Sequence, residues 1–266
     1  LPMWELAGNY TGTMIGYHAI PVIVDAYLKG SPIDAKLALE ACLRSAEYDT
    51  AAPIATTSYL KHHALIPVSK YYKNTWGYIP CDVENESVAK GLEYAYNDWC
   101  ISVLAEALGD TAIQHTYQKR GQAYRNYYDA STGFMRGKDS QGQWRTPFNP
   151  RASNHRADDY CEGTAWQWTW FAPHDVEGLV ELMGGTQAFC EKLDSLFVAD
   201  SSLEGDLVSA DISGLIGQYA HGNEPSHHIL HLYNAIGQPW KTQQLIDKVL
   251  HTQYFNAPDG LSGNED

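Results

Sequence analysis

One stretch of the chain decides the fold class: residues 84–110, ENESVAKGLEYAYNDWCISVLAEALGD. Its apolar side chains recur every three or four residues, which is the spacing of one face of an α-helix. These side chains are Val88, Leu92, Ala95, Trp99, Val103 and Leu104. Gly109 and Asp110 then interrupt the pattern with residues that are typical of a helix end. The stretch therefore predicts a single long helix from about residue 84 to residue 108.

Helical signals continue on both sides of this stretch. Asp110 is a typical N-cap for a second helix that runs to about Tyr128, and the turn residues of TGFMRGKD follow it. Further helices are predicted over residues 13–28, 186–198, 225–236 and 239–251. Alternating β patterns are scarce, so the predicted fold class is all-α.

The start of another helix shows three signals in a row. Ser31 is the expected cap, Pro32 the first-turn proline and Asp34 the acidic residue of the first turn, which predicts a helix over residues 33–47. Helix pairs recur along the chain, as expected when helices alternate between the inner and outer layers of a toroid. A helical barrel, or a portion of one, is the predicted architecture, and a generic helical bundle is the alternative.

Composition limits the classes of partner. The chain of 266 residues has 18 Lys and Arg against 32 Asp and Glu, and its formal net charge is −14. Such a charge argues against nucleic acid and anionic membranes as partners. No apolar run is long enough to predict a membrane span. The opening residues, LPMWELAGNY, lack a basic region followed by an apolar stretch, so no signal peptide is predicted here.

The five cysteines are widely spaced: Cys42, Cys81, Cys100, Cys161 and Cys190. They form no CxxC pair and no short Cys/His ligand pattern. We expect them to be buried free thiols that pack like small hydrophobic residues. A nucleophilic Cys161 is the alternative, although no activating base is identifiable beside it.

Residues 158–175, DDYCEGTAWQWTWFAPHD, place a glutamate before a run of aromatic residues. If residues 162–170 are helical, Glu162, Trp166 and Trp170 share one face. An apolar wall beside a carboxyl group raises its pKa, which suits a general acid at neutral pH. The alternative is a capping glutamate beside a buried aromatic cluster.

Two further segments carry polar clusters. In HGNEPSHHILH, residues 221–231, His227 and His231 are four apart, which raises zinc as an alternative without an obvious third ligand. The amide oxygen of Asn223 is the kind of hard donor that calcium prefers. The final PDGLSGNED is either a solvated turn or the source of a carboxylate that faces Glu162 across a pocket, as glycoside hydrolysis requires.

Six blocks of the sequence, in order, resemble the catalytic domain of glycoside hydrolase family 92. They are GNYTGTMIGYHAIPVIVDAYLKG, VENESVAKGLEYAYNDWC, TGFMRGKD, YCEGTAWQWTWFAPHDVEGLVELMGG, GNEPSHHILHLYN and DGLSGNED. The resemblance implies an exo-acting, calcium-dependent α-mannosidase that inverts the anomeric configuration. It also implies an (α/α)6 barrel that follows a β-sandwich domain.

The resemblance also assigns roles to residues. Glu162 matches the general acid, and Asp266 matches the general base that activates water. Asn223 matches a calcium-ligand region, and the calcium ion would also contact Asp266. Asn264 occupies a position that is often Asp in the family. The residues expected to contact the substrate are His221, Glu224, Trp166 and Asn264, the first two on the leaving-group side.

The extent of the resemblance predicts a portion of one catalytic domain over residues 1–266. The β-sandwich domain and the helices that follow the closing block are absent from this chain, and the missing segments would complete the pocket. The HGNEP block favours α-1,2-linked mannose in a glycan as the substrate, and the family implies a secreted or periplasmic enzyme. The alternatives are a non-catalytic carbohydrate-binding fragment and a zinc-dependent hydrolase.

Overall fold

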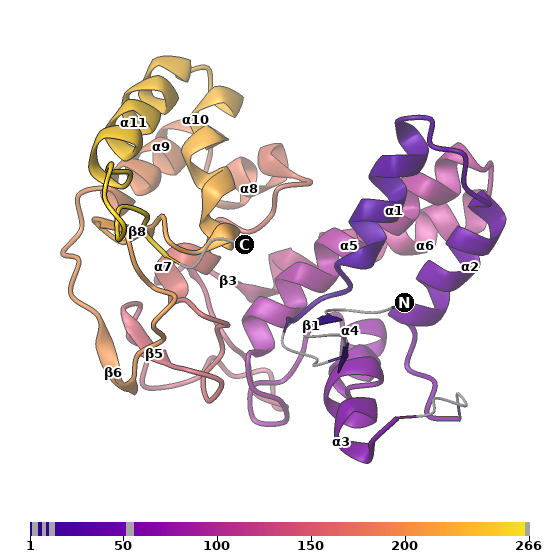
Figure 1. Cartoon of the computed structure of the whole chain (residues 1–266). Helices are drawn as coiled ribbons and strands as arrows, with labels where there is room; N and C mark the ends of the chain where they lie inside the picture. The colour runs from indigo at the N-terminus through magenta and orange to yellow at the C-terminus, as the bar shows by residue number, and fades with distance from the viewer. Residues whose placement is uncertain (2–4, 7–8, 11–13, 52–55, 264–266) are drawn as a thin grey trace. The chain divides into compact units, whose positions relative to one another are not determined.

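The computed structural model describes residues 1, 5–6, 9–10, 14–51 and 56–263. Helices make up most of its regular structure, while the strands form pairs of two to four residues each (Figure 1). The predicted helical class with few strands is therefore confirmed, and the (α/α)6 barrel stays a prediction. Within the described residues, no helix combines the length and the apolar character that crossing a bilayer requires.

The chain divides into two compact units. The first consists of Leu1–Tyr127 and Lys138–Gln143, and the second of Tyr128–Gly137 and Trp144–Asp266. The prediction of a single domain over residues 1–266 stays a prediction. All the residues that the sequence assigns to chemistry belong to the second unit.

The first unit is built mainly from helices. They are α1 (Ala19–Leu28), α2 (Ala35–Ala46), α3 (Ser58–Leu60), the π-helix η1 (Lys61–Leu65), α4 (Ser69–Thr75), α5 (Ser87–Ala107), α6 (Thr111–Gly121) and the 3-10 helix η2 (Gln122–Tyr127). Two short strands, β1 (Glu5–Leu6) and β2 (Asn9–Tyr10), pair antiparallel.

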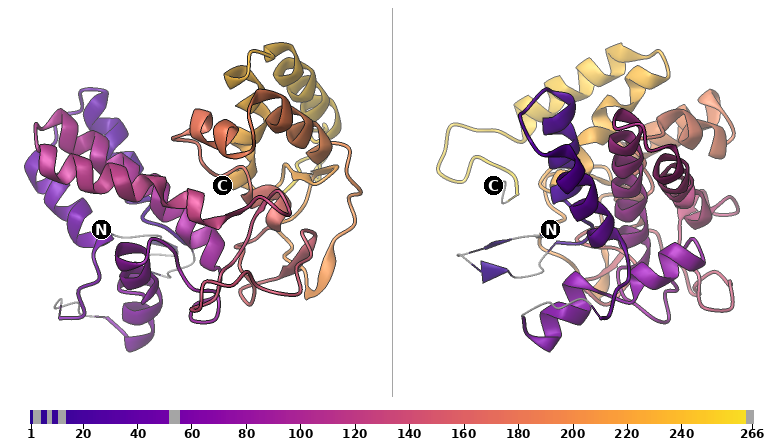
Figure 2. Two further views of the ribbon diagram at one scale, coloured as in Figure 1. Left: turned by 180° about the vertical axis from the view of Figure 1, so that it is seen from behind. Right: turned by 90° about the vertical axis from the view of Figure 1, so that its right-hand side faces the viewer.

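The helix α5 is the long helix that the sequence predicts, and it forms the centre of the first unit's core. Figures 1 and 2 show α1, α2 and α6 packed beside it. The core includes Ile20, Val24, Leu39, Cys42, Ile101, Leu104 and Tyr117. Burial on α5 extends beyond the predicted apolar stripe, because Glu93, Asn97 and Asp98 are buried as well. A helix that is buried on several sides is typical of a central position in a unit.

The start of α2 differs from the prediction. The side chain of Asp34 accepts a hydrogen bond from the backbone N–H of Leu37 at 3.1 Å, so Asp34 is the N-cap. The prediction that Ser31 caps this helix was wrong, because the carboxylate of Asp34 satisfies the free N–H group three residues later. The second predicted cap is confirmed, since Asp110 accepts from the N–H of Ile113 at 3.1 Å.

The helix α4 lies outside all the helices that the sequence predicts. Its Lys70 and Lys73 are both buried. The ammonium group of Lys73 is 2.6 Å from the carboxylate of Asp98 on α5. Lysine is normally a surface residue. A short helix with two lysines on its buried face lacks the apolar spacing from which helices are predicted.

The second unit combines short helices with three strand pairs. Its helices are α7 (Ala165–Trp168), α8 (Val176–Leu182), α9 (Thr186–Leu196), the 3-10 helix η3 (Glu224–His231), α10 (Leu232–Ala235) and α11 (Pro239–Thr252). Its strands are β3 (Tyr128–Asp129) with β4 (Phe134–Met135), β5 (Ala152–Asn154) with β6 (Glu204–Leu207), and β7 (Leu215–Ile216) with β8 (Tyr219–Ala220). The predicted helix over residues 225–236 is therefore mostly a 3-10 helix.

All five cysteines are buried and free, as the sequence predicts. Burial raises the pKa of the Cys42 thiol to about 11 and that of the Cys100 thiol to about 12. Both thiols are therefore protonated at neutral pH and are poor nucleophiles. Cys161 is also buried, which gives no support to its alternative role as a nucleophile.

Candidate functional site

Glu162 lies in a tight loop before a very short helix. Its backbone has φ +48, in the left-handed region that non-glycine residues seldom adopt. The helix α7 begins only after Thr164, whose side chain accepts from the N–H of Trp166 and forms a capping box with Gln167. The condition that residues 162–170 are helical is therefore not met, because the cap fixes the helix start beyond Glu162.

Strand β4 forms hydrogen bonds with residues that precede and follow Glu162 in the chain. The hydroxyl of Tyr160 donates to the carbonyl of Met135 at 2.7 Å, and the N–H of Met135 donates to Oγ1 of Thr169 at 3.0 Å. Both Tyr160 and Met135 are buried. A single residue of the TGFMRGKD block therefore fixes the chain before and after Glu162.

The aromatic run mainly anchors the loop and the core. The indole N–H of Trp168 donates to the carbonyl of Cys161 at 2.7 Å, directly before Glu162. Trp170 is fully buried and packs edge-on against Phe189. Trp168 was not predicted, because the hydrogen bond depends on a reversal of the chain that the sequence pattern does not contain.

Trp166 has its own neighbours. Its ring packs edge-on against Phe134 with 4.9 Å between centroids, and Nζ of Lys192 lies 4.7 Å from the Trp166 ring centroid. Burial lowers the pKa of Lys192 to about 8. Because Glu162 is outside the helix, Trp166 does not share a helical face with it, and its predicted contact with the substrate stays a prediction.

Asn223 connects two of the blocks that the sequence singles out. Its side chain is buried, and its Nδ2 donates to the carbonyl oxygen of Glu162 at 2.6 Å. Asn223 occupies the N-cap position of η3, but its side chain makes no capping hydrogen bond there. The GNEP and CEG blocks, 61 residues apart in sequence, therefore meet directly.

A second contact brings in the closing block. A Cβ added to Gly222 would lie 3.0 Å from Cα of Gly263, so the two backbones pass close together. Only glycine allows such an approach without displacement of a neighbour. Asn264 and Asp266, which follow Gly263 in the sequence, lie outside the described residues, and their predicted roles stay predictions.

His221 lies beside this contact and is engaged at both ring nitrogens. The Tyr219 hydroxyl is 2.9 Å from Nδ1, and the Tyr254 hydroxyl is 2.7 Å from Nε2. Burial, together with the nearby His227, lowers the pKa of His221. Glu224 is exposed at the start of η3. Tyr219 and Tyr254 were not predicted, since no motif in the sequence marks either of them.

The histidines of η3 contribute to structure. His227 and His228 each donate a ring N–H to a backbone carbonyl, that of His221 at 2.8 Å and that of Trp170 at 3.0 Å. Four residues on a 3-10 helix correspond to a rotation of roughly 120° beyond a full turn, so His227 and His231 do not share a face. In the described part of the chain, no group of three His, Cys, Asp or Glu side chains could hold a metal ion. The zinc alternative therefore has no support here.

Calcium takes oxygen ligands, in contrast to the nitrogen and sulfur ligands that zinc prefers. The Nδ2 atom of Asn223 points to the Glu162 carbonyl, which leaves the amide oxygen of Asn223 as an available hard donor. This residue fits the chemistry of a calcium ligand. Calcium takes about six to eight oxygen ligands, so the remaining ones would come from Asp266, other segments, water or substrate.

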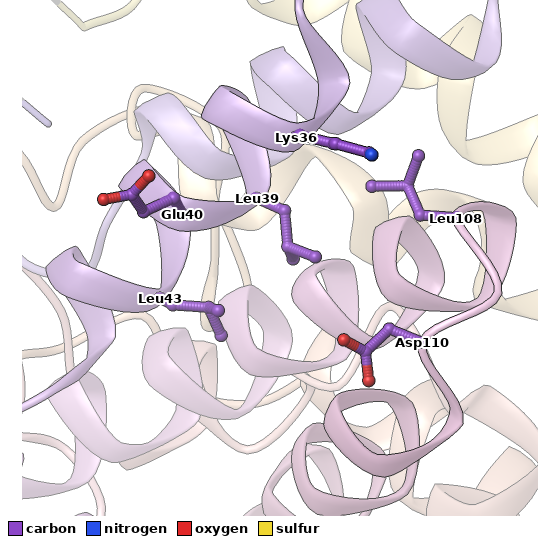
Figure 3. A pocket seen from close by; sticks show the side chains of 6 residues that line it. All are labelled: Lys36, Leu39, Glu40, Leu43, Leu108 and Asp110. Carbon is purple, nitrogen blue, oxygen red and sulfur yellow. The ribbon is translucent and has the colours of Figure 1, made fainter.

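A separate pocket of about 320 Å³ lies in the first unit (Figure 3). Figure 3 shows Leu39, Leu43 and Leu108 pointing into it, with Lys36, Glu40 and Asp110 around them. The Asp110 carboxylate is engaged as the N-cap of α6. None of the residues assigned to chemistry lines this pocket, so it is not the candidate site.

The whole chain matches a known family. The family model "Glycosyl hydrolase family 92 catalytic domain" matches residues 1–266. A curated relative from Arthroderma benhamiae, named an uncharacterized secreted glycosidase, is 27% identical over 280 residues. The alignment covers 96% of this chain and 33% of that protein.

Solved structures agree with this match. An α-mannosidase of family GH92 from Bacteroides thetaiotaomicron, in complex with mannoimidazole, is 39% identical with a TM-score of 0.86, over 99% of this chain and 33% of the other. A family GH92 inverting mannosidase from the same organism is 36% identical with a TM-score of 0.79, over 96% and 34%. This chain thus spans about one third of the length of these relatives.

Proposed function

Since the chain belongs to glycosyl hydrolase family 92, we propose that it supplies catalytic residues of an exo-acting α-mannosidase that hydrolyses terminal mannose with inversion. The observation that carries this proposal is the meeting of three blocks in the second unit. Asn223 binds the Glu162 backbone, and Gly222 contacts Gly263 directly before the closing residues. The solved relatives, an α-mannosidase and an inverting mannosidase, support the same chemistry.

In the proposed mechanism, Glu162 is protonated and donates its proton to the glycosidic oxygen as the bond to the anomeric carbon breaks. Asp266 accepts a proton from water, whose oxygen attacks the anomeric carbon from the opposite face. An inverting pair of carboxyl groups is separated by about 6.5–9.5 Å, which leaves room for that water. The products are β-mannose and the shortened glycan.

The remaining predicted residues would bind and orient the sugar. His221 and Glu224 lie on the leaving-group side in this proposal, and Trp166 and Asn264 contribute further contacts. Asn223 and Asp266 would hold a calcium ion, which supplies positive charge for binding two ring hydroxyls of the terminal mannose. The preferred linkage in this proposal is α-1,2.

The proposed substrate is a mannose-containing glycan, and the proposed location is outside the cytoplasm. The curated relative is named a secreted glycosidase, which supports export. A periplasmic location is part of the same proposal for a bacterial source. Fractionation of the producing cells, with the protein followed by immunoblot, tests this location.

The substitution Glu162→Gln in the full-length protein tests the proposed acid. Turnover of a mannobiose, whose leaving group needs a proton, is expected to fall by about 10²-fold or more. An aryl mannoside with a good leaving group should lose much less, because its departure needs less protonation. Glu177→Gln, at an exposed position on α8, is the control and should leave both rates unchanged.

Two outcomes would contradict the proposal. Near-normal turnover of mannobiose by the Glu162→Gln variant would remove Glu162 from the role of general acid. Binding of mannose by the wild-type protein without any hydrolysis would favour the alternative of a carbohydrate-binding protein.

A further inference from the structure

A chain of three side chains crosses the candidate site from the core to the surface. It runs from the Tyr219 hydroxyl to Nδ1 of His221 at 2.9 Å, and from Nε2 of His221 to the Tyr254 hydroxyl at 2.7 Å. A neutral imidazole has one donor and one acceptor nitrogen. In either tautomer, one tyrosine therefore donates to His221 and the other accepts from it, so both ring nitrogens are used.

The surroundings of His221 hold its ring in one position. The ring is buried and stacks on His227 with 4.7 Å between the centroids. His227 is held in this stack by its own hydrogen bond to the His221 carbonyl. His221 is therefore a bridge between two hydroxyl groups.

The outer end of the chain is Tyr254. Tyr219 is 0% exposed and His221 7%, whereas Tyr254 is 39% exposed. Within the described part of the protein, His221 is the hydrogen-bond partner of the Tyr254 hydroxyl. A phenolic hydroxyl both donates and accepts, so one further hydrogen bond remains for a ligand. A ligand that approaches this side meets Tyr254 before it meets His221.

The backbone around Tyr254 ties it to the closing block. Tyr254 forms an antiparallel bridge with Leu261, and the N–H of Phe255 donates to the carbonyl of Gly260 at 2.8 Å. Gly260 is required in this turn, since an added Cβ would collide with the Phe255 carbonyl oxygen. The same turn leads to Gly263, which contacts Gly222. Tyr254 is thus held next to the place where the three blocks meet.

We propose that Tyr254 is a substrate-binding residue that contacts the leaving-group sugar. Its hydroxyl, oriented by His221 and Tyr219, hydrogen-bonds a hydroxyl of that sugar, while its ring packs against the sugar face. Because both ring nitrogens of His221 have partners, the contact proposed for His221 on the leaving-group side would run through the Tyr254 hydroxyl. This inference rests on the proposed function, in which His221 lies on the leaving-group side.

The test compares two substrates with the Tyr254→Phe variant of the full-length protein. The phenyl ring remains, so only the hydroxyl contact is lost. For α-1,2-mannobiose, kcat/KM is expected to fall roughly 10-fold, as for the loss of one hydrogen bond to substrate. For 4-nitrophenyl α-mannoside, whose leaving group has no sugar hydroxyl, kcat/KM should stay within about 2-fold.

Tyr233→Phe is the matched control. It also removes a tyrosine hydroxyl from a hydrogen bond in the second unit, that with Asp194 at 2.8 Å. The ratio of kcat/KM for the two substrates should be that of the wild type in this control. An unchanged ratio for Tyr254→Phe, or an equal loss on both substrates, overturns the inference.

Parallel measurements with Glu162→Gln separate this inference from the proposed function. If Glu162→Gln hydrolyses mannobiose normally, the proposed acid role of Glu162 fails; if the wild-type protein binds mannose without hydrolysing mannobiose, the proposed function fails, whatever the Tyr254 result. If Glu162→Gln is inactive on mannobiose while Tyr254→Phe keeps the wild-type ratio, only the inference about Tyr254 fails.

Discussion

At the scale of single residues, Glu93 shows how burial alone changes chemistry. It lies on α5 and is 5% exposed, and its Oε2 is 3.9 Å from Nδ1 of His18. Burial raises the pKa of Glu93 to about 8. The carboxyl group is therefore mostly protonated at neutral pH. Burial of the neutral form costs less free energy than burial of the carboxylate would.

This environment predicts a dependence of stability on pH. The pKa of Glu93 is higher in the folded protein than its ordinary value of 4.5, so the folded state binds the proton more tightly. The resulting stabilisation is complete below about pH 4.5 and is lost as the pH rises through about 8. At pH 9 we expect Glu93→Gln to be more stable than the wild type by more than about 1 kcal/mol, measured by urea unfolding.

The control for this prediction is Glu106→Gln, at an exposed position of the same helix. Its unfolding free energy should follow that of the wild type at every pH. If the free energy of unfolding of Glu93→Gln depends on pH in the same way as that of the wild type, Glu93 is not buried in a protonated state.

The site residues were predictable to different degrees. The resemblance placed Glu162 and Asn223 in separate blocks, and the structure joins these two blocks by a hydrogen bond across 61 residues. The shared face of Glu162 and Trp166 depended on a helix over residues 162–170, and this condition is not met, because the capping box of Thr164 and Gln167 starts the helix beyond Glu162. Tyr254 contacts His221 across 33 residues, so no local signal could identify it.

At the scale of elements, long helices were predicted well and short ones poorly. The helix α5 repeats its apolar spacing over many turns, and its bounds, Ser87–Ala107, agree closely with the prediction. The seven residues of α4 include two buried lysines, so their burial depends on partners in other elements. The 3-10 geometry of η3 could not be read from sequence either, because 3-10 and α-helices share similar residue preferences.

The contact between η3 and the closing segment is an element-scale test of the site. A methyl group at Gly222 would meet Gly263 and the Oγ of Ser213. We therefore expect Gly222→Ala to separate these two segments and to lower kcat/KM for mannobiose by about 10²-fold, as for a displacement on the order of 1 Å.

The variant Ser213→Ala provides the comparison for this prediction. It removes the Oγ atom and leaves the contact of the two glycines, so it should keep nearly normal activity. In the double variant the collision with the Gly263 backbone remains, and activity should stay low. Full activity of Gly222→Ala would show that the two segments need not touch.

At the scale of the whole molecule, the chain spans about one third of the length of its relatives. Activity is therefore a proposal about the full-length protein. The proposed calcium site illustrates this point, because Asn223 offers one amide oxygen and the other ligands would come from elsewhere. The predicted barrel is a second example. Each unit has buried residues of its own, but a barrel is a ring formed by all the helices, so it stays a prediction.

Removal of metal is a test at this scale. Treatment of the full-length protein with a chelator is expected to abolish hydrolysis, and added calcium should restore it, because the proposed ion would help to bind substrate hydroxyls. Zinc should fail to restore activity, since the amide and carboxylate oxygens of the proposed site suit calcium, whereas zinc prefers nitrogen and sulfur ligands. Activity that is indifferent to the chelator would remove calcium from the proposal.

The most direct measurement of the central claim is the anomeric form of the first product. Proton NMR of a fresh digest of α-1,2-mannobiose by the full-length protein distinguishes β-mannose from α-mannose before mutarotation. A proton from Glu162 and attack by water on the opposite face predict that β-mannose appears first. The appearance of α-mannose first would contradict an inverting mechanism with this pair of carboxyl groups.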